Sequence, residues 1–241
     1  MAPAIEGARA RARAQLTQEI KTEARRQLAA DGPQRLSLRA VARELGMASS
    51  ALYRYFASRD ELLTALIMDA YDALGEAAER AVAHARRERA AEGVRGCWRA
   101  LARAVRAWSK AHPHEYALLY GTPVPGYAAP KETVQPAARV PVLMLGLLEE
   151  HAGELRPAGD PPAVRGEFAE QLRRLGAELA PNLSGTVLAR AIGVWIQLIG
   201  MIGFELFGHL VGSADPADGF FAWTVEDTAD RLGLPGRPAP A

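Results

Sequence analysis

The sequence predicts an all-helical protein in which a small amino-terminal three-helix domain precedes a larger helical domain. Apolar residues recur at helical spacing along most of the 241 residues, and no segment alternates in the manner of a β-strand. Glycine and proline collect between the periodic segments, where they would end helices. A hydrophobic content of 49% is enough to bury a substantial core, so an unfolded chain is not expected.

A first helix is expected over residues 16–30. Its apolar stripe repeats every four residues and consists of Leu16, Ile20, Ala24 and Leu28. The sequence Asp31-Gly32-Pro33 ends this helix, because glycine accepts a left-handed conformation and proline cannot continue the hydrogen-bonding pattern.

Two shorter helices follow within residues 36–56 and are separated by Gly46. The first has Ser37 at the position of an N-cap and an apolar face made of Leu38, Val41, Ala42 and Leu45. The second is capped by Ser49 or Ser50. Its apolar side chains, which face back onto the first helix, are Leu52 and Phe56. Two short helices joined by a turn that contains glycine form the helix-turn-helix of DNA-binding proteins.

A third helix begins at Ser58-Arg59-Asp60-Glu61, which has the form of a capping box. It continues with an apolar face of Leu62, Leu63, Leu66, Ile67 and Tyr71. We place the helix-turn-helix domain at residues 1–60, a bridging helix at 61–80, the larger domain at 61–235 and an unordered tail at 236–241.

The larger domain is expected to contain several helices, separated by breaks at which glycine and proline collect. The breaks are predicted near residues 90–93, 121–130 and 155–162. The helices after the second break are expected at residues 133–151, 164–180, 184–212 and 216–233.

Charge is distributed unevenly along the chain. Residues 1–60 hold 11 Lys and Arg against 6 Asp and Glu, whereas the remainder holds 18 against 22. The amino-terminal domain is therefore the one expected to meet an anionic partner. A single cysteine, Cys97, excludes an intramolecular disulfide, and together with the lack of an apolar leader it favours a reduced cytoplasm.

Residues 36–63, LSLRAVARELGMASSALYRYFASRDELL, resemble the helix-turn-helix of TetR regulators. The match in order and spacing is carried by Gly46, Leu52-Tyr53, Tyr55-Phe56 and the capping box. The sequence departs from the family pattern at Leu38, where threonine is frequent, and at Met47, where valine is usual. The stretch from Trp108 through His112-Pro113 to Tyr116 and Gly121 is similar to the subset with a WHG effector domain.

This resemblance implies a transcriptional regulator that holds DNA with its helix-turn-helix. The start of the second helix would lie in the major groove and present Ser49, Ser50 and Ala51 to base edges. Arg39 would reach guanine or a phosphate. The phosphate contacts would come from Ser37, Tyr53, Tyr55 and Arg59. The alternative is core packing for the two tyrosines and an ordinary solvated side chain for Arg39 and Arg59. The arginines at positions 9, 11 and 13 form either a flexible arm on the DNA backbone or an unordered segment.

The resemblance also implies a homodimer, a palindromic operator and release by a small molecule, with repression as the usual mode and no cofactor or metal. The dimer is expected through the helices at 184–212 and 216–233, because the first is apolar almost all round; the alternative is an ordinary buried helix. The effector is expected to be apolar or aromatic. The candidate lining residues of its pocket, each with core packing as the alternative, are Trp98, Trp108, Tyr116, Tyr120, Met144 and Trp195.

An enzyme and a membrane protein are the alternatives. His112, His114 and Glu115 lie close together, but the histidines lack the i, i+4 spacing that places two imidazoles on one helical face. The sequence has neither a G-x-S-x-G motif nor a phosphate-binding glycine loop, so an enzyme is not expected. The apolar stretch 191–212 has about the length of a membrane span, but polar residues interrupt it. These residues are Gln197, Glu205 and His209.

Overall fold

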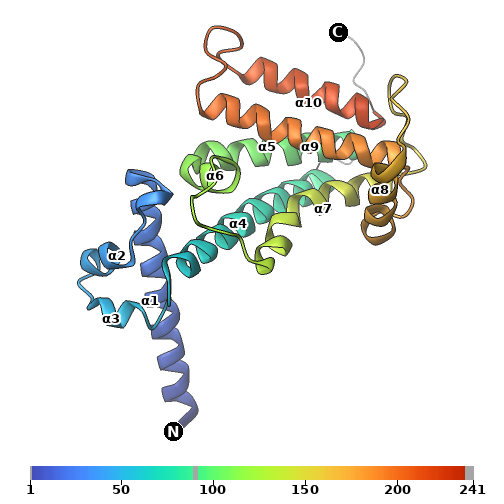
Figure 1. The fold of residues 1–241 in the computed structure, drawn as a ribbon. Helices are drawn as coiled ribbons and strands as arrows, with labels where there is room; N and C mark the ends of the chain where they lie inside the picture. The colour runs from blue at the N-terminus through green and yellow to red at the C-terminus, as the bar shows by residue number, and fades with distance from the viewer. Residues whose placement is uncertain (1, 89–91, 237–241) are drawn as a thin grey trace. The chain divides into compact units, whose positions relative to one another are not determined.

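The structure, a computed structural model, describes residues 2–88 and 92–236. The described residues form helices, turns and loops without a strand, which confirms the predicted all-helical class. Residues 89–91 of the predicted break and residues 237–241 of the predicted tail lie outside the described residues. The chain divides into two compact units, and Figure 1 identifies their helices. The units are Met1–Tyr71 with His114–Val134, and Asp72–Pro113 with Gln135–Ala241.

The first unit is built around a helix-turn-helix. Its elements are α1 (Ala2–Asp31), η1 (Pro33–Arg35), α2 (Leu38–Glu44), α3 (Ser49–Leu52), the first turns of α4 (Arg59–Glu88), α6 (Pro113–Tyr120) and η3 (Lys131–Thr133). The predicted start of the first helix at residue 16 is wrong, since α1 begins at Ala2. Alanine alternates with arginine over residues 8–14, and both have high helix propensity, which explains the longer helix.

The core of the first unit joins the apolar faces predicted from the sequence. α1 contributes Ile20, Ala24 and Leu28, while Leu16 is only partly buried against them. The buried side chains of the following helices that pack in the same cluster are Leu38, Val41, Ala42, Leu52, Phe56, Leu62, Leu63, Leu66 and Ile67. Helix spacing therefore identified the residues that hold α2 and α3 together.

A segment from the middle of the sequence, residues 114–134, completes this unit. Val124 is buried in the same apolar cluster. The hydroxyls of Thr64 and Tyr127 lie 2.9 Å apart in a hydrogen bond. Arg25 of α1 forms an ion pair with Glu115 of α6, with 3.1 Å between Nε and Oε1. The segment is thus tied to both α1 and α4 within the unit, a feature that helix periodicity did not predict.

Both ends of α2 are fixed as its sequence predicts. The Ser37 hydroxyl accepts a hydrogen bond from the Ala40 amide at 3.4 Å, which is the predicted N-cap. At the other end, Gly46 has a φ of 64°. The Gly46 amide donates to the Arg43 carbonyl and the Met47 amide to the Ala42 carbonyl, at 3.1 and 2.8 Å. This is a Schellman motif, which stops α2 and sets the direction of the turn.

Replacing Gly46 with alanine is expected to destabilise the first unit by about 1–2 kcal/mol, the cost of a left-handed conformation for a residue with a Cβ. No neighbouring atom lies within 4 Å of the position that the added Cβ would take, so backbone strain is the only expected cost. Urea denaturation followed by circular dichroism would measure it. An unchanged midpoint would show that the turn does not require its positive φ.

The start of α4 differs in one detail from the predicted capping box. The Ser58 hydroxyl accepts from the Glu61 amide at 3.0 Å, as predicted. The Glu61 carboxylate, however, accepts from the amide of Ala57 at 2.6 Å rather than from that of Ser58. The predicted domain boundary after residue 60 falls within this first turn of α4.

The second unit is a helical bundle. Its elements are the rest of α4, α5 (Gly93–Ala111), α7 (Val134–Glu150), α8 (Gly166–Leu179), α9 (Gly185–Leu206) and α10 (Asp218–Leu232). α5 packs against α9 and α10, and α8 packs against α9. The predicted end of the α9 helix at residue 212 is wrong, because Gly208 takes a φ of 78° and the His209 amide turns back to the Phe204 carbonyl at 2.8 Å.

Among the described residues, α9 alone is long and apolar enough to cross a bilayer. One of its faces packs inside the second unit through Val194, Leu198 and Ile202. α9 is therefore read as a core helix of the bundle.

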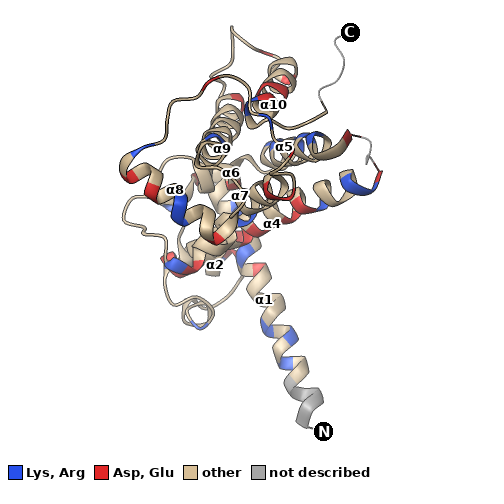
Figure 2. Ribbon diagram, turned by 90° about the vertical axis from the view of Figure 1, so that its right-hand side faces the viewer, with Lys and Arg blue, Asp and Glu red and all other residues tan. Residues whose placement is uncertain are grey.

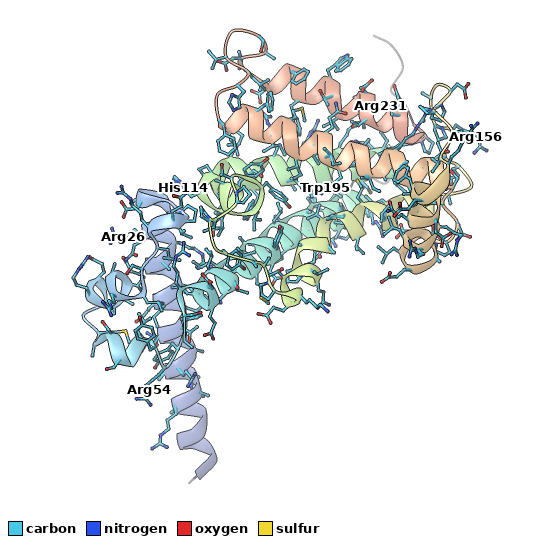
Figure 3. All side chains as sticks on the ribbon, in the orientation of Figure 1. Arg26, Arg54, His114, Arg156, Trp195 and Arg231 are labelled. Atoms are coloured by element: carbon cyan, nitrogen blue, oxygen red, sulfur yellow. The ribbon has the colours of Figure 1, made fainter. Side chains whose placement is uncertain are left out.

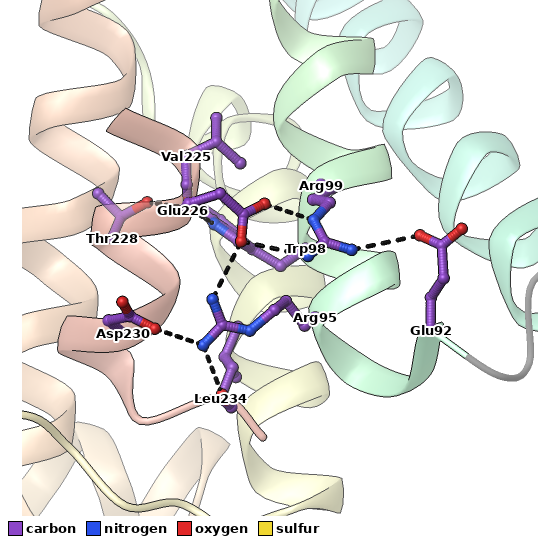
Figure 4. Close-up of polar contacts among 9 residues, drawn as sticks. All are labelled: Glu92, Arg95, Trp98, Arg99, Val225, Glu226, Thr228, Asp230 and Leu234. Atoms are coloured by element: carbon purple, nitrogen blue, oxygen red, sulfur yellow. Dashed lines mark hydrogen bonds and ion pairs between the residues drawn. The ribbon is translucent and has the colours of Figure 1, made fainter. Parts of the chain in front are cut away.

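A buried arginine connects α5 to α10 (Figure 4). The Arg95 side chain is 2% exposed, and its guanidinium donates to the Glu226 carboxylate at 3.1 Å, the Asp230 carboxylate at 2.6 Å and the Leu234 carbonyl at 2.8 Å. One turn further along α5, Arg99 also pairs with Glu226. These hydrogen bonds lower the pKa of Glu226, chiefly through Arg99 and then through Arg95 against the opposing effect of burial. The network holds the carboxyl-terminal helix on the bundle.

Candidate nucleic-acid interface

The short α3 helix presents its first turn to solvent. Ser49 and Ser50 are exposed, Ala51 is half-buried, and Leu52 is fully buried against α2. The predicted serine cap is wrong: Ala48 occupies the N-cap position and no side chain caps the helix, so Ser49 is the first helical residue. Both serine hydroxyls therefore have no capping role, and the three predicted base-reading residues stand together at one exposed end.

Two residues of α2 lie on the same helix-turn-helix. Arg39 is exposed on the first turn and has no ion-pair partner among the described residues. Ser37 already accepts the Ala40 amide through its Oγ atom, but its hydroxyl proton is not used by that bond. The predicted phosphate contact of Ser37 is compatible with its role as a cap.

The aromatic residues after α3 divide between surface and core. Tyr53 is 44% exposed, whereas Phe56 is 5% exposed and lies in the apolar cluster. Tyr55 is half-buried and packs against that cluster. Tyr53 thus stands at the surface as the predicted DNA contact requires, Phe56 is a core residue, and Tyr55 contributes to packing while part of its ring faces solvent.

Arg59 differs from the other predicted phosphate contacts, because its guanidinium is already engaged. Its Nη2 donates to the Pro33 carbonyl at 2.8 Å and its Nη1 lies 3.3 Å from the Asp60 carboxylate. Arg59 therefore links the start of α4 to η1. The amino-acid pattern did not indicate this structural role.

An arginine of α1 that the motif does not include also belongs to this surface. The Arg13 guanidinium lies over the Tyr55 ring, 5.3 Å from its centroid, and donates to the Arg54 carbonyl at 3.3 Å. Figure 3 shows Arg54 beside α1. The run of alternating arginines was the only sequence signal for this contact.

The predicted effector-pocket residues are not gathered into one place within either unit. Tyr116 and Tyr120 belong to the first unit. Trp98, Trp108, Met144 and Trp195 belong to the second, where the Trp98 indole donates to the Val225 carbonyl at 3.0 Å. Among the described residues, no group of three or more potential ligands is placed to hold a metal ion.

A cavity of about 330 Å³ lies between α4 and α5, and none of the six predicted residues lines it. Both small and polar residues line it. The polar lining residues are His84, Glu92, Arg99 and Arg103, and the small ones are Ala81, Ala85, Gly96, Ala100, Ala104 and Ala107.

The sequences of the helix-turn-helix and of the larger domain both match known protein families. Residues 20–66 match the family described as bacterial regulatory proteins, tetR family, and residues 98–228 match the tetracyclin repressor-like C-terminal domain. The HTH-type transcriptional regulator Mb1846 of Mycobacterium bovis is 40% identical over 208 residues, which cover 84% of this chain and 86% of the relative. The regulator Rv1816 of Mycobacterium tuberculosis matches to the same extent.

Two solved structures have a similar fold. The putative regulatory protein SCO4313 is 33% identical, with a TM-score of 0.72 over 90% of this chain and 97% of its own. A protein of unknown function from Rhodococcus sp. RHA1 is 25% identical, with a TM-score of 0.67 over 91% of this chain and 96% of its own. The named relatives are regulators rather than enzymes. This chain belongs to the TetR family of helix-turn-helix transcriptional regulators.

Proposed function

We propose that this regulator is a cytoplasmic homodimer that represses transcription from a palindromic operator and is released from DNA by a small molecule. The observation that carries the proposal is the first turn of α3, where Ser49 and Ser50 are exposed and Ala51 is half-buried on the helix-turn-helix. A helix end of this kind fits the major groove and offers its first side chains to base edges. Selection of bound duplexes from a random pool, using the full chain, tests it.

Base reading is assigned to the exposed residues of α3 and to Arg39. A serine hydroxyl can bond several bases, the Ala51 methyl can contact thymine, and a guanidinium can pair with guanine. The phosphate contacts are assigned to the Ser37, Tyr53 and Tyr55 hydroxyls and to Arg59. For Arg59 this contact must come from the N–H groups that Pro33 and Asp60 leave free.

Replacing Ser49 with alanine is expected to change which sequence is preferred, whereas Tyr53→Phe is expected to weaken binding to all duplexes by about fivefold. The first removes a base contact and the second a phosphate hydrogen bond worth about 1 kcal/mol. Competition binding at matched salt, with the selected operator and a scrambled duplex, separates the two effects. A sequence-selective loss in Tyr53→Phe would reassign that tyrosine to base reading.

Dimerisation is supported by an apolar surface on the last two helices of the second unit. Ile196 on α9 and Trp223 on α10 are each 64% exposed, and Gly193 and Gly200 leave open space beside them. Further exposed apolar side chains of this surface are Ile192, Phe204, Phe207 and Phe220. Several large apolar side chains exposed on two helices that pack together indicate an interaction site. Two copies packed through α9 and α10 would bury it and pair two α3 helices for a palindrome.

The effector is proposed to be a small apolar or aromatic molecule bound in the second unit. Two places in this unit suit such a ligand: the apolar core that contains Trp98, Trp108 and Met144, and the α4–α5 cavity, which none of these three residues lines. The ligand would act by favouring a state of the dimer that mismatches the operator. Tyr116 and Tyr120, which the sequence also predicted to line the pocket, belong to the first unit.

A further inference from the structure

The amino-terminal part of α1 is a purely basic segment. Residues 7–18 contain three arginines and no acidic residue, and the charge colouring of α1 in Figure 2 shows them. Arg9, Arg11 and Arg13 are all exposed. None of the three forms an ion pair with another described residue, whereas Lys21 and Arg25 farther along α1 pair with Asp69 at 2.8 and 2.6 Å. We name residues 7–14 the basic extension.

The basic extension is anchored beside the recognition surface. Arg13 lies over the Tyr55 ring and donates to the Arg54 carbonyl, at the end of the turn that follows α3. The Arg13 carbonyl in turn accepts the Thr17 hydroxyl at 2.9 Å, within α1. The arginines therefore project from a helix whose base contacts the same turn that carries Tyr53 and Tyr55.

Helix geometry places two of these charges on one face of α1, whereas Arg11, two residues from each, lies on the opposite side of the helix. Arg9 and Arg13 are four residues apart and share a face, and a rise of 1.5 Å per residue separates them by about 6 Å along the axis. Phosphates of one strand follow each other every ~3.4 Å along a duplex, so this separation corresponds to about two phosphates. The side chains between the arginines are alanines, which let the helix approach a backbone closely and give it no apolar face for a membrane.

We propose that the basic extension is a second DNA-binding element beside the half-site that α3 reads, in which Arg9 and Arg11, on opposite sides of α1, contact phosphates of the two strands across a groove of the duplex. It adds affinity without reading sequence, because guanidinium–phosphate contacts carry no base information. This inference rests on the proposed binding of duplex DNA by α3. It extends that proposal to base pairs outside the half-site, which the helix-turn-helix residues alone would not contact.

The test compares the full chain with the Arg9→Ala/Arg11→Ala variant. The matched control is Arg173→Ala/Arg174→Ala, which removes two exposed arginines from α8 in the second unit. Binding of the selected operator and of a scrambled duplex of the same length is titrated over a range of salt concentrations. The slope of log K against log salt is expected to fall by about 2 for each bound subunit, and binding at 0.2 M salt is expected to weaken by about tenfold for each bound subunit.

The loss is expected to be equal for both duplexes and absent from the control. Arg9→Lys/Arg11→Lys, which keeps both charges, is expected to retain the wild-type slope. Trimming the base pairs outside the half-sites should weaken the wild type and leave the alanine variant unaffected. Circular dichroism checks that α1 stays folded in the alanine variant, as the high helix propensity of alanine favours.

The inference is overturned if the alanine variant keeps the wild-type slope and affinity on an operator that the wild type binds, or if the lysine variant loses binding as the alanine variant does. A wild-type chain that binds no duplex at any salt concentration contradicts the proposed function itself. These results are distinguishable, because the first two require a functioning helix-turn-helix and the last shows that there is none.

Discussion

Ile196→Glu is expected to separate the proposed dimer into monomers and to weaken binding of the proposed operator by about a hundredfold or more. Ile196 is 64% exposed on α9 and is one of the exposed apolar side chains of the proposed α9–α10 interface. In a two-fold interface, the substitution places two carboxylates against apolar surface, and unpaired buried charges cost several kcal/mol. Since about 1.4 kcal/mol corresponds to a factor of ten, a loss of two or more orders of magnitude follows.

Val142→Glu provides the matched control for this experiment. Val142 is a branched apolar residue on α7 that is 41% exposed and lies outside the α9–α10 surface. Sedimentation velocity should show a monomer for the Ile196 variant and the wild-type species for the control, with unchanged circular dichroism in both. A dimeric Ile196→Glu protein with normal operator affinity would place the interface elsewhere.

Arg95→Ala is expected to lower the free energy of unfolding by about 3 kcal/mol, as is typical when one partner of a buried ion pair is removed. Arg95 is almost fully buried, and it provides hydrogen bonds to Glu226, Asp230 and the Leu234 carbonyl. Its loss leaves two neighbouring carboxylates with fewer donors and opens a void between α5 and α10. Arg95→Met keeps most of the volume and isolates the loss of charge. Arg103→Ala, an exposed site on the same helix, should change stability little.

Thiol labelling and the pH dependence of stability both measure the effect of the Arg95 substitutions. Cys97 is buried, and burial raises the pKa of its thiol, so its alkylation at neutral pH reports opening of α5. Labelling should be faster in both Arg95 variants than in the control. Because the folded state lowers the pKa of Glu226, its stabilising contribution is present above the ordinary value of 4.5 and is lost as the pH falls below it. The gap in stability between wild type and Arg95→Met should therefore narrow in acid.

The helix-turn-helix was predictable because its signals are local. Ser37, Gly46 and Ser58 act through backbone groups within a few residues, and the structure places all three as helix boundaries. Apolar spacing likewise identified the core positions of α1, α2 and α4. The end of α9 was missed, although Gly208 has the same conformation as Gly46, because the apolar pattern continues past it to residue 212.

The contacts that sequence reasoning did not find join distant positions. Arg59 binds the Pro33 carbonyl and Arg13 lies over Tyr55, and neither pair has a periodic signature. The Arg95 network had a weak periodic signature in the sequence. Arginines four residues apart on α5 face acidic residues four apart on α10, but which helices pack together depends on tertiary structure that helix periodicity does not encode.

Residues 114–134 belong to the first unit, and this limits how chimeras of this regulator and its relatives can be built. A chimera cut once after Tyr71 would receive Val124, Tyr127 and Glu115 from a foreign protein, and these must fit the cluster around Leu66, the Thr64 hydroxyl and Arg25. A graft that transfers operator choice should carry both stretches of chain together. Otherwise the donor's helix-turn-helix would pack poorly against the host's residues 114–134. The chimera would then bind its operator weakly for a reason unrelated to base recognition.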